Sequence, residues 1–257
     1  KVVEINSVSL AGRDAGNYAI GAVPSATASI LASPLGAKAI AADKVYDGTT
    51  VATVSIVLSG IIGEDEVIAS ASGTFADKNI GSDKMVSITD FMITGSDATN
   101  YSEGAISNTT ASITAAFLVA TAKATDKIYD GTSKAEISVS LAGIVDGDVV
   151  NGTASGTFSD RNVGVGKSVS VGPVVLSGTD AANYQVEESG VTMADITPAS
   201  LAVTAIANAK FFGGEDPPLN FEASGFVGDD TLTSSVSGNL ARQPGEEIGV
   251  YEILIGN

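Results

Sequence analysis

The sequence predicts an all-β protein built from small domains in tandem. Residues 52–58 and 135–141 alternate apolar and polar side chains, which is the period-two pattern of a strand with one buried face. No stretch of ten residues places apolar side chains at helical spacing. The chain also repeats itself at a fixed spacing, so each folding unit must be small.

The composition agrees with several thin cores. Of the 257 residues, 44% are hydrophobic and 17% are charged, a balance typical of folded proteins. Aromatic residues make up only 5% and tryptophan is absent, so small and β-branched side chains must fill the cores.

The charge and the missing residue types exclude several functions. Thirteen Lys and Arg against 30 Asp and Glu give a net charge of −17, which repels nucleic acids and anionic membrane surfaces. The sequence has no apolar run that could span a bilayer, so we expect no membrane insertion. Without cysteine or histidine, it lacks disulfides, thiolate chemistry and the commonest general base.

A shift of 83 residues, the distance from Lys44 to Lys127, superimposes the distinctive motifs without a gap. Lys44, Tyr46, Asp47 and Gly48 fall on Lys127, Tyr129, Asp130 and Gly131, and Asn100 and Tyr101 fall on Asn183 and Tyr184. The motif of residues 12–18 matches residues 95–101 in the same register, so the repeat also covers part of the N-terminal segment.

These matches divide the chain into four parts. We expect a C-terminal remnant of a repeat at 1–34, complete repeats at 35–117 and 118–200, and a divergent, truncated repeat at 201–257. Pro34 and Pro198 lie near two junctions whose linkers are only a few residues long, which favours an elongated, stiff rod. Neighbouring repeats are then the partners of each unit, and we expect a monomer.

Five to seven short strands in about 80 residues indicate an immunoglobulin-like sandwich, and a β-grasp-like mixed sheet is the alternative. At most one helical turn is expected, opened by Asp97 as its N-cap and closed by Asn100 in the left-handed conformation. Tyr101 then begins a strand with its ring over the core. Asp180, Asn183 and Tyr184 predict the same turn in the second repeat.

The motifs resemble those of a known family. Residues 44–49 and 127–132 read Lys-x-Tyr-Asp-Gly-Thr, residues 73–81 and 156–164 read Gly-Thr-Phe-x-Asp-x-Asn-x-Gly, and residues 95–101 and 178–184 read Gly-x-Asp-Ala-x-Asn-Tyr. This pattern resembles the YDG-type repeats of large bacterial surface proteins, and residues 201–257 resemble the related MBG repeat. The resemblance implies a secreted adhesin of the filamentous-haemagglutinin or biofilm-matrix kind, an extracellular location and no catalytic residues.

The Tyr-Asp-Gly motif has a structural and a functional interpretation. Tyrosine beside aspartate could contact a sugar, but Asp-Gly is a turn dipeptide and a neighbouring tyrosine usually covers a core. We therefore expect Tyr46 and Tyr129 to cover the cores with their hydroxyls on backbone groups, and Tyr101 and Tyr184 to fix corners of the sandwich.

Three acidic clusters in corresponding loops raise the hypothesis of calcium binding. They are Glu64-Asp65-Glu66, Asp146-Gly147-Asp148 and Asp229-Asp230. Two or three carboxylates in one loop could hold calcium and stiffen a rod, but none of the clusters matches a complete calcium-loop pattern, so solvated turn residues are the alternative. We expect no other cofactor.

A second hypothesis is an autocatalytic crosslink between Lys44 and Asn100 or between Lys127 and Asn183. Such a bond requires a desolvated lysine next to a carboxyl group that shuttles protons.

Taken together, these patterns predict a structural stalk or spacer that projects a binding domain from a bacterial surface in adhesion or biofilm formation. Direct binding of a polysaccharide or a partner surface by the repeats is the alternative. A glycosidase with a carboxylate pair is a third possibility, but carboxylates that recur once per unit suit folding better than one active site, so we expect no enzyme.

Overall fold

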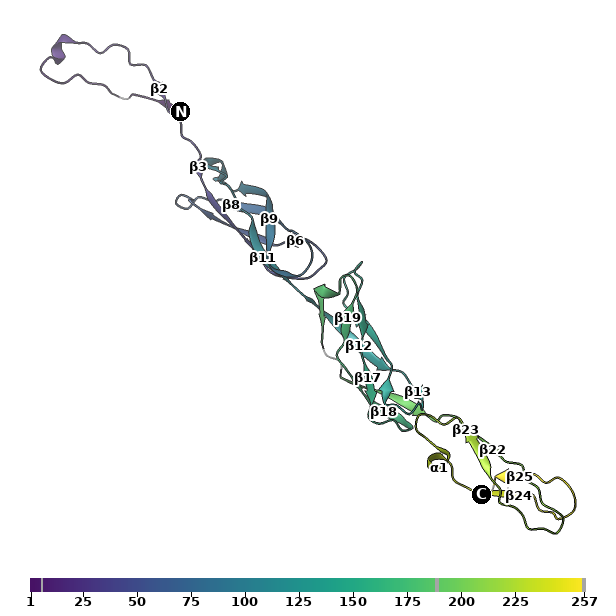
Figure 1. Cartoon of the computed structure of the whole chain (residues 1–257). Coiled ribbons are helices and arrows are strands. Elements are labelled where there is room, and N and C mark those ends of the chain that lie inside the picture. The colour runs from purple at the N-terminus through teal and green to yellow at the C-terminus, as the bar shows by residue number, and fades with distance from the viewer. Residues whose placement is uncertain (6, 188–189, 256–257) are drawn as a thin grey trace. The chain divides into compact units, whose positions relative to one another are not determined.

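The computed structural model describes residues 1–5, 7–187 and 190–255. The chain forms two compact units, Lys1–Thr114 and Ala115–Asn257 (Figure 1). Each unit contains one complete repeat, and nearly all regular structure in both is β-strand. The all-β prediction is confirmed.

The first complete repeat contains β3 (Ser33–Pro34), β4 (Gly36–Ala41), β5 (Lys44–Val45), β6 (Val51–Ala52), β7 (Val54–Ser59), β8 (Ile68–Phe75), β9 (Gly81–Thr94), β10 (Tyr101–Ser102) and β11 (Thr109–Thr114). Its larger sheet has five strands in the order β5-β11-β9-β8-β6. The β5-β11 pair is parallel and the other pairs are antiparallel. Two further ladders join β4 to β7 in antiparallel and β3 to β10 in parallel orientation.

The second complete repeat contains β12 (Ala116–Ala124), β13 (Lys127–Ile128), β14 (Lys134–Ala135), β15 (Ile137–Ala142), β16 (Asn151–Thr153), β17 (Gly156–Phe158), β18 (Gly164–Val171), β19 (Val175–Ser177), β20 (Tyr184–Val186) and β21 (Val191–Thr197). Its five-stranded sheet has the order β13-β21-β18-β17-β14. A three-stranded sheet, β15-β12-β20, lies against it, and β16 pairs with β19.

The two repeats use the same pairing with different strand breaks. One strand, β12, covers the positions that β3 and β4 cover in the first repeat, and it crosses the predicted boundary between residues 117 and 118. The long strands β8 and β9 correspond to the pairs β16-β17 and β18-β19.

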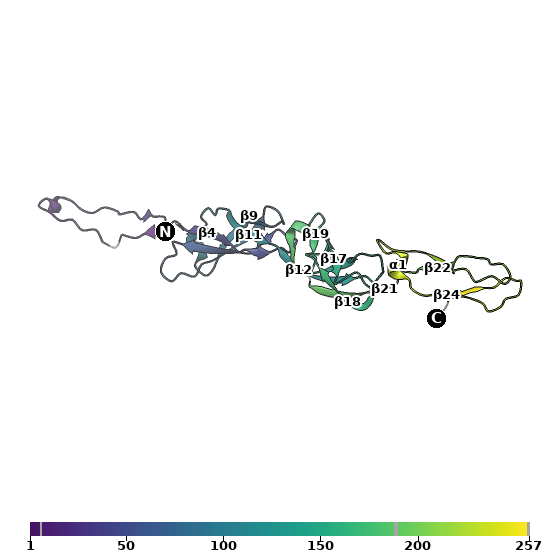
Figure 2. The same ribbon diagram turned by 60° about the horizontal axis from the view of Figure 1, so that its bottom comes forward.

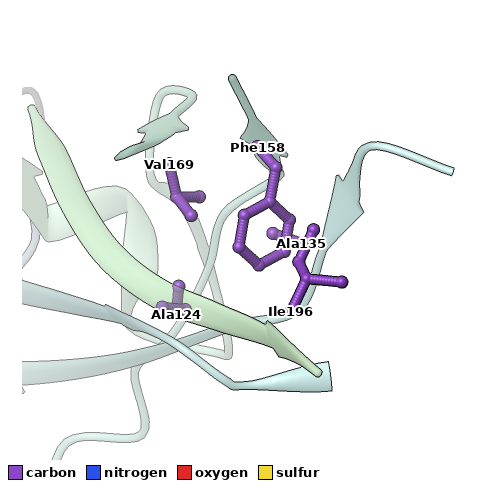
Figure 3. Packing of buried hydrophobic residues seen from close by; sticks show 6 residues of the cluster. Ala124, Ala135, Phe158, Val169 and Ile196 are labelled. Atoms are coloured by element: carbon purple, nitrogen blue, oxygen red, sulfur yellow. The ribbon is translucent and has the colours of Figure 1, made fainter. Parts of the chain in front are cut away.

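The core of the second repeat lies between its two sheets. Six buried residues form it, namely Ala124, Ala135, Phe158, Val169, Ala194 and Ile196. Ala124 comes from the three-stranded sheet, and the other five come from strands of the five-stranded sheet. Figure 3 shows the Phe158 ring among smaller side chains of the core.

The second repeat thus has two layers of sheet, and the five-stranded sheets of both repeats are mixed, because their β5-β11 and β13-β21 pairs are parallel. The helices described in the two complete repeats are the three-residue 3₁₀ turns η2 (Ala98–Asn100) and η3 (Ala181–Asn183). Among the described residues, no helix is long and apolar enough to cross a membrane.

The single helical turn occurs where the sequence predicts it, but the predicted side-chain cap is missing. Asp97 precedes η2 without capping it through its side chain, and its Oδ2 instead accepts a hydrogen bond from the Glu66 backbone nitrogen at 3.0 Å. The prediction that the Asp97 side chain caps the turn was wrong, because this carboxylate accepts its hydrogen bond from Glu66, which lies 31 positions earlier in the sequence.

The left-handed conformation falls on Gly95, at φ 126°, and not on Asn100. A side chain at Gly95 would overlap the Glu66 carbonyl group. Tyr101 does begin a strand and is buried.

The two end segments are more open than the complete repeats. The N-terminal one has β1 (Val2–Val3), η1 (Ala15–Asn17) and β2 (Ala26–Thr27), and Figure 2 shows it as a long loop closed by its two short strands. The C-terminal one has β22 (Ala202–Ala205), β23 (Phe221–Ser224), α1 (Leu232–Ser235), β24 (Leu240–Arg242) and β25 (Ile253–Ile255). Its two ladders, β22-β23 and β24-β25, are each antiparallel.

We predict that Phe158→Ala lowers the free energy of unfolding of the second repeat by about 3–5 kcal/mol, because it removes the largest side chain of the core. Phe117→Ala is the matched control, since Phe117 lies in the same unit and is 65% exposed. Chemical denaturation followed by circular dichroism measures both. Equal losses in the two variants would contradict this assignment of the core.

Candidate functional site

The Lys-x-Tyr-Asp-Gly-Thr motif folds into a turn closed by its own lysine. Lys44 Nζ donates to Asp47 Oδ1 at 2.7 Å and to the Thr49 and Val51 carbonyl oxygens at 2.8 and 3.0 Å. Asp47 Oδ1 also accepts a hydrogen bond from the Thr49 backbone nitrogen at 2.9 Å. Gly48 lies between them at φ 76°, which a glycine adopts without strain.

The second repeat reproduces this turn. Lys127 Nζ donates to Asp130 Oδ1 at 2.7 Å and to the Thr132 and Lys134 carbonyl oxygens at 2.8 and 2.9 Å. We call this arrangement, at Lys44 with Asp47 and at Lys127 with Asp130, the lysine clamp.

Each lysine clamp also covers the core. Lys44 Nζ lies 5.6 Å from the centre of the Phe75 ring, and Lys127 Nζ lies 5.5 Å from the centre of the Phe158 ring. An ammonium at this distance from an aromatic face is attracted by the ring. The motif therefore joins a surface turn to the buried phenylalanine.

The clamp changes the acidity of its aspartates. Hydrogen bonds from Lys127, the larger cause, and from Thr132 lower the pKa of Asp130 from 3.8 to about 2. Partial burial alone would raise the pKa of Asp47, but the hydrogen bonds from Lys44 and Thr49 outweigh it and the pKa is lowered.

A second lysine–aspartate pair follows the Gly-Thr-Phe strand in each repeat. Lys84 Nζ lies 2.7 Å from Asp77 Oδ1, and Lys167 Nζ lies 2.8 Å from Asp160 Oδ2. The hydrogen bond from the lysine lowers the pKa of the aspartate in both pairs. The repeated charges of this motif are thus paired within the repeat.

The predicted crosslinks do not match this geometry. The Nζ atoms of Lys44 and Lys127 donate to a carboxylate, a hydroxyl and carbonyl groups of their own turns. Asn100 and Asn183 lie instead at the ends of η2 and η3. The lysine nitrogens are therefore engaged in their own turns and not directed at these asparagines.

Tyr101 and Tyr184 each hold a loop of their own repeat through two hydrogen bonds. Tyr101 Oη donates to Asp65 Oδ2 at 2.6 Å and accepts from the Ile62 backbone nitrogen at 2.8 Å. Tyr184 Oη makes the same two contacts with Asp148 Oδ2 at 2.6 Å and the Val145 nitrogen at 2.9 Å. The hydrogen bond to Asp65 raises the pKa of Tyr101.

The acidic clusters proposed for calcium therefore have other contacts. Asp65, Asp148 and Asp230 each accept a tyrosine hydroxyl, and Glu66 accepts the Ser96 hydroxyl at 3.2 Å. Glu64, Asp146 and Asp229 are exposed. Across residues 1–5, 7–187 and 190–255, no three acidic side chains come together as metal ligands would.

Tyr46 and Tyr129 occupy the equivalent position next to the clamp. Tyr46 is buried, as expected of a residue that covers a core. Tyr129 Oη donates to a side chain, Asp230 Oδ2, at 2.9 Å, whereas the sequence predicted a backbone partner. This hydrogen bond raises the pKa of Tyr129.

The Tyr129–Asp230 contact joins the second repeat to the C-terminal segment. The two residues line a cavity of about 310 Å³ together with Val163, Leu201 and Phe226. Asp230 lies in one of the three acidic clusters, but its tyrosine comes from the preceding repeat. Sequence reasoning found both residues and missed their contact, because they are 101 positions apart.

The C-terminal segment contains a cluster of four charges that the sequence did not reveal. Lys210 lies 2.9 Å from Asp216 and 2.7 Å from Glu246, and Arg242 lies 3.2 and 2.9 Å from the same two carboxylates. Hydrogen bonds from Lys210 and then Arg242 lower the pKa of both acids. The Arg242 guanidinium also lies 4.9 Å from the centre of the Tyr251 ring.

Two hollows of about 600 Å³ each adjoin this charge cluster. One is lined by Phe221, Leu240 and Ile253 together with Asp216, and the other by Phe211, Phe212 and Glu246. Lys210, Arg242 and Tyr251 line both. Both hollows therefore combine aromatic and charged side chains.

We predict that acid destabilises the second repeat through the lysine clamp. Because the pKa of Asp130 is lowered to about 2, its contribution to stability is complete above pH 4 and is lost as the pH falls toward 2. Asp130→Asn should be less stable at neutral pH and lose less stability over this range. Thermal unfolding between pH 2 and pH 7 measures the difference. Asp146→Asn, in an exposed loop, is the control and should keep the wild-type pH profile.

We also predict energetic coupling between Tyr129 and Asp230. A double-mutant cycle with Tyr129→Phe and Asp230→Asn should give a coupling energy of about 0.5–1.5 kcal/mol, the range of one hydrogen bond. The same cycle with Asp229→Asn should be additive, because Asp229 is exposed beside Asp230. Additivity in both cycles would mean that the contact does not stabilise the junction.

Comparison with known protein families agrees with this division of the chain. The YDG domain model matches residues 32–112 and 113–193, and the MBG domain (YGX type) model matches residues 201–257. Neither the curated proteins nor the solved structures contain a significant match. The two YDG matches cover more than half of the sequence, and the chain therefore belongs to the YDG domain family, with an MBG domain of the YGX type after the second YDG domain.

Proposed function

We propose that this chain is a stalk or spacer region of a secreted bacterial surface adhesin, and that it projects a binding domain from the cell in adhesion or biofilm formation. The proposal rests on the YDG and MBG domains, which are compatible with such a region. In this role the chain acts outside the cell as a monomer, and its partners are its own neighbouring repeats.

One observation carries the proposal. The polar residues that recur in both YDG domains have partners inside the fold: Lys44 and Lys127 close turns, and Tyr101 and Tyr184 fix loops. A binding surface built from the repeats would be expected to present recurring side chains to solvent. Here the recurring side chains stabilise each domain.

The acidic residues of the MBG domain also favour a role other than catalysis. A glycosidase needs one carboxyl group with a raised pKa as its general acid. Lys210 and Arg242 lower the pKa of Asp216 and Glu246, the two carboxylates at the hollows. We therefore propose a non-enzymatic function.

The spacer function predicts that length increases with the number of repeats. An additional copy of residues 118–200 inserted after Ser200 should increase the maximum dimension in small-angle X-ray scattering and leave the cross-section unchanged. A second inserted copy should add an equal increment. A larger cross-section at an unchanged maximum dimension would contradict a spacer.

Binding of a polysaccharide by the MBG domain is the second candidate, and one observation favours it. Phe211 and Phe212 are 92% and 72% exposed beside the charge cluster, and sugar rings stack on exposed aromatic faces. Sedimentation with insoluble biofilm polysaccharide tests this function. The binding candidate predicts retention of the chain and loss of retention in Phe211→Ser/Phe212→Ser, whereas the spacer alone predicts no retention.

A further inference from the structure

The sequence contains three Asp-Gly peptide bonds, which follow Asp47, Asp130 and Asp146. Such a bond is open to a spontaneous reaction, because glycine has no side chain to keep its own backbone nitrogen away from the carboxyl carbon of the aspartate. A five-membered succinimide ring forms, and its hydrolysis leaves isoaspartate, in which the main chain runs through the side-chain carbon. The three bonds share this local chemistry, so the fold decides which of them react.

The lysine clamp restrains two of the three carboxylates. Asp130 Oδ1 accepts hydrogen bonds from Lys127 Nζ at 2.7 Å, from the Thr132 backbone nitrogen at 2.9 Å and from Thr132 Oγ1 at 2.9 Å. Asp47 Oδ1 has the same three kinds of donor in its own clamp. These donors fix the orientation of the carboxylate and favour its charged form, which is a poor acceptor for an attacking nitrogen.

Acidity and packing add to the restraint at Asp130. Its pKa is lowered to about 2, so the carboxyl group is almost entirely ionised at mildly acidic pH, whereas the reaction needs the protonated group. A side chain placed on Gly131 would contact Val227 at 3.4 Å and Gly228 at 3.9 Å. Formation of the ring changes the backbone here, and the neighbouring loop leaves little space for that change.

The bond after Asp146 has no such restraint. Asp146 is exposed in the turn between β15 and β16, and within residues 1–5, 7–187 and 190–255 its carboxylate has no hydrogen bond. A side chain at Gly147 would meet nothing within 4 Å, so the surroundings leave room for the ring. The first YDG domain has Gly63 and Glu64 at the corresponding positions, and this bond therefore belongs to the second domain alone.

We propose that the Asp146-Gly147 bond is a site of spontaneous isoaspartate formation, and that the lysine clamps protect the bonds after Asp47 and Asp130 from the same reaction. The Gly147 nitrogen bonds to Asp146 Cγ and loses its proton, and the carboxyl hydroxyl leaves with that proton as water. Water then opens the ring at one of its two carbonyl carbons. Opening at the main-chain carbonyl gives isoaspartate, opening at Cγ restores aspartate, and the mass of the chain is unchanged in both cases.

The modified bond lies inside the loop that Tyr184 holds. Tyr184 Oη accepts a hydrogen bond from the Val145 nitrogen at 2.9 Å and donates one to Asp148 Oδ2 at 2.6 Å. Asp146 and Gly147 are the two residues between these anchors. Isoaspartate lengthens the main chain between the anchors by a methylene group, so the two hydrogen bonds cannot both keep their geometry. We therefore expect the reaction to loosen this loop of the second YDG domain.

Prolonged incubation of the intact chain at mildly acidic pH, folded and in unfolding concentrations of urea, tests the proposal. Peptide mapping with electron-transfer fragmentation locates isoaspartate at each of the three positions. In urea the three bonds should react at comparable rates, because only their shared local chemistry remains. In the folded chain Asp146 should keep most of that rate, whereas Asp130 should react more slowly than in urea by about tenfold or more, since each unit by which a pKa is lowered removes about nine-tenths of the protonated form.

Equal rates at Asp146 and Asp130 in the folded chain overturn the proposal. A difference that persists unchanged in urea also overturns it, because the difference then comes from the sequence and not from the fold. Asp146→Glu is the matched control, since its longer side chain cannot close a five-membered ring. The Val145 amide should stay protected from hydrogen exchange in this variant and lose protection in the wild type as isoaspartate accumulates. Unchanged protection in the modified wild type would contradict the loosening of the loop.

Opening one clamp gives a second measurement. Lys127→Gln removes the ammonium group that holds Asp130, so isoaspartate formation at Asp130 should rise toward its rate in urea. Asp47 keeps its own clamp in the first YDG domain and should stay protected. Circular dichroism shows whether the variant is folded. An unreactive Asp130 in the folded variant means that the clamp is not the protecting group and overturns the proposal, and if the variant unfolds, the comparison of folded and unfolded wild type decides.

Discussion

The lysine clamp is the interaction on which each complete YDG domain depends, because it joins the surface turn to the small core. The core of the second domain has one large side chain, Phe158, packed against alanine, valine and isoleucine. Lys127 lies over that ring and at the same time closes the turn through Asp130. In so small a core, a residue that both orders a turn and covers the buried phenylalanine stabilises the domain more than its single salt bridge suggests, since exposed pairs contribute little by themselves.

Tyrosine–aspartate hydrogen bonds extend this stabilisation to the loops. Tyr184 holds the loop of Asp148 in its own domain, and Tyr129 reaches Asp230 in the segment that follows. The same chemistry thus serves inside a domain and at its junction with the next. The spacer that we propose would need both, because neighbouring domains that share only a linker move independently of each other.

The MBG domain differs from the complete YDG domains in how its side chains are held together. Among residues 201–254 of the MBG domain, none is buried, and four charges linked by short ion pairs lie where its two ladders meet the hollows. The second YDG domain therefore has a buried apolar core, whereas the MBG domain has linked ion pairs and no buried residue among 201–254.

The sequence by itself determined the all-β class, the repeat of 83 residues and the structural role of Tyr101 and Tyr184, because these depend on local periodicity and on motifs present twice. It predicted a capped turn at Asp97 and a backbone partner for Tyr129, and both predictions were wrong, since the actual partners come from distant loops. The four-charge cluster was also invisible, because Lys210 and Glu246 are 36 positions apart and match no motif. Only the tertiary structure decided these contacts, because a side chain finds its partner among groups that folding brings together, whatever their spacing in the sequence.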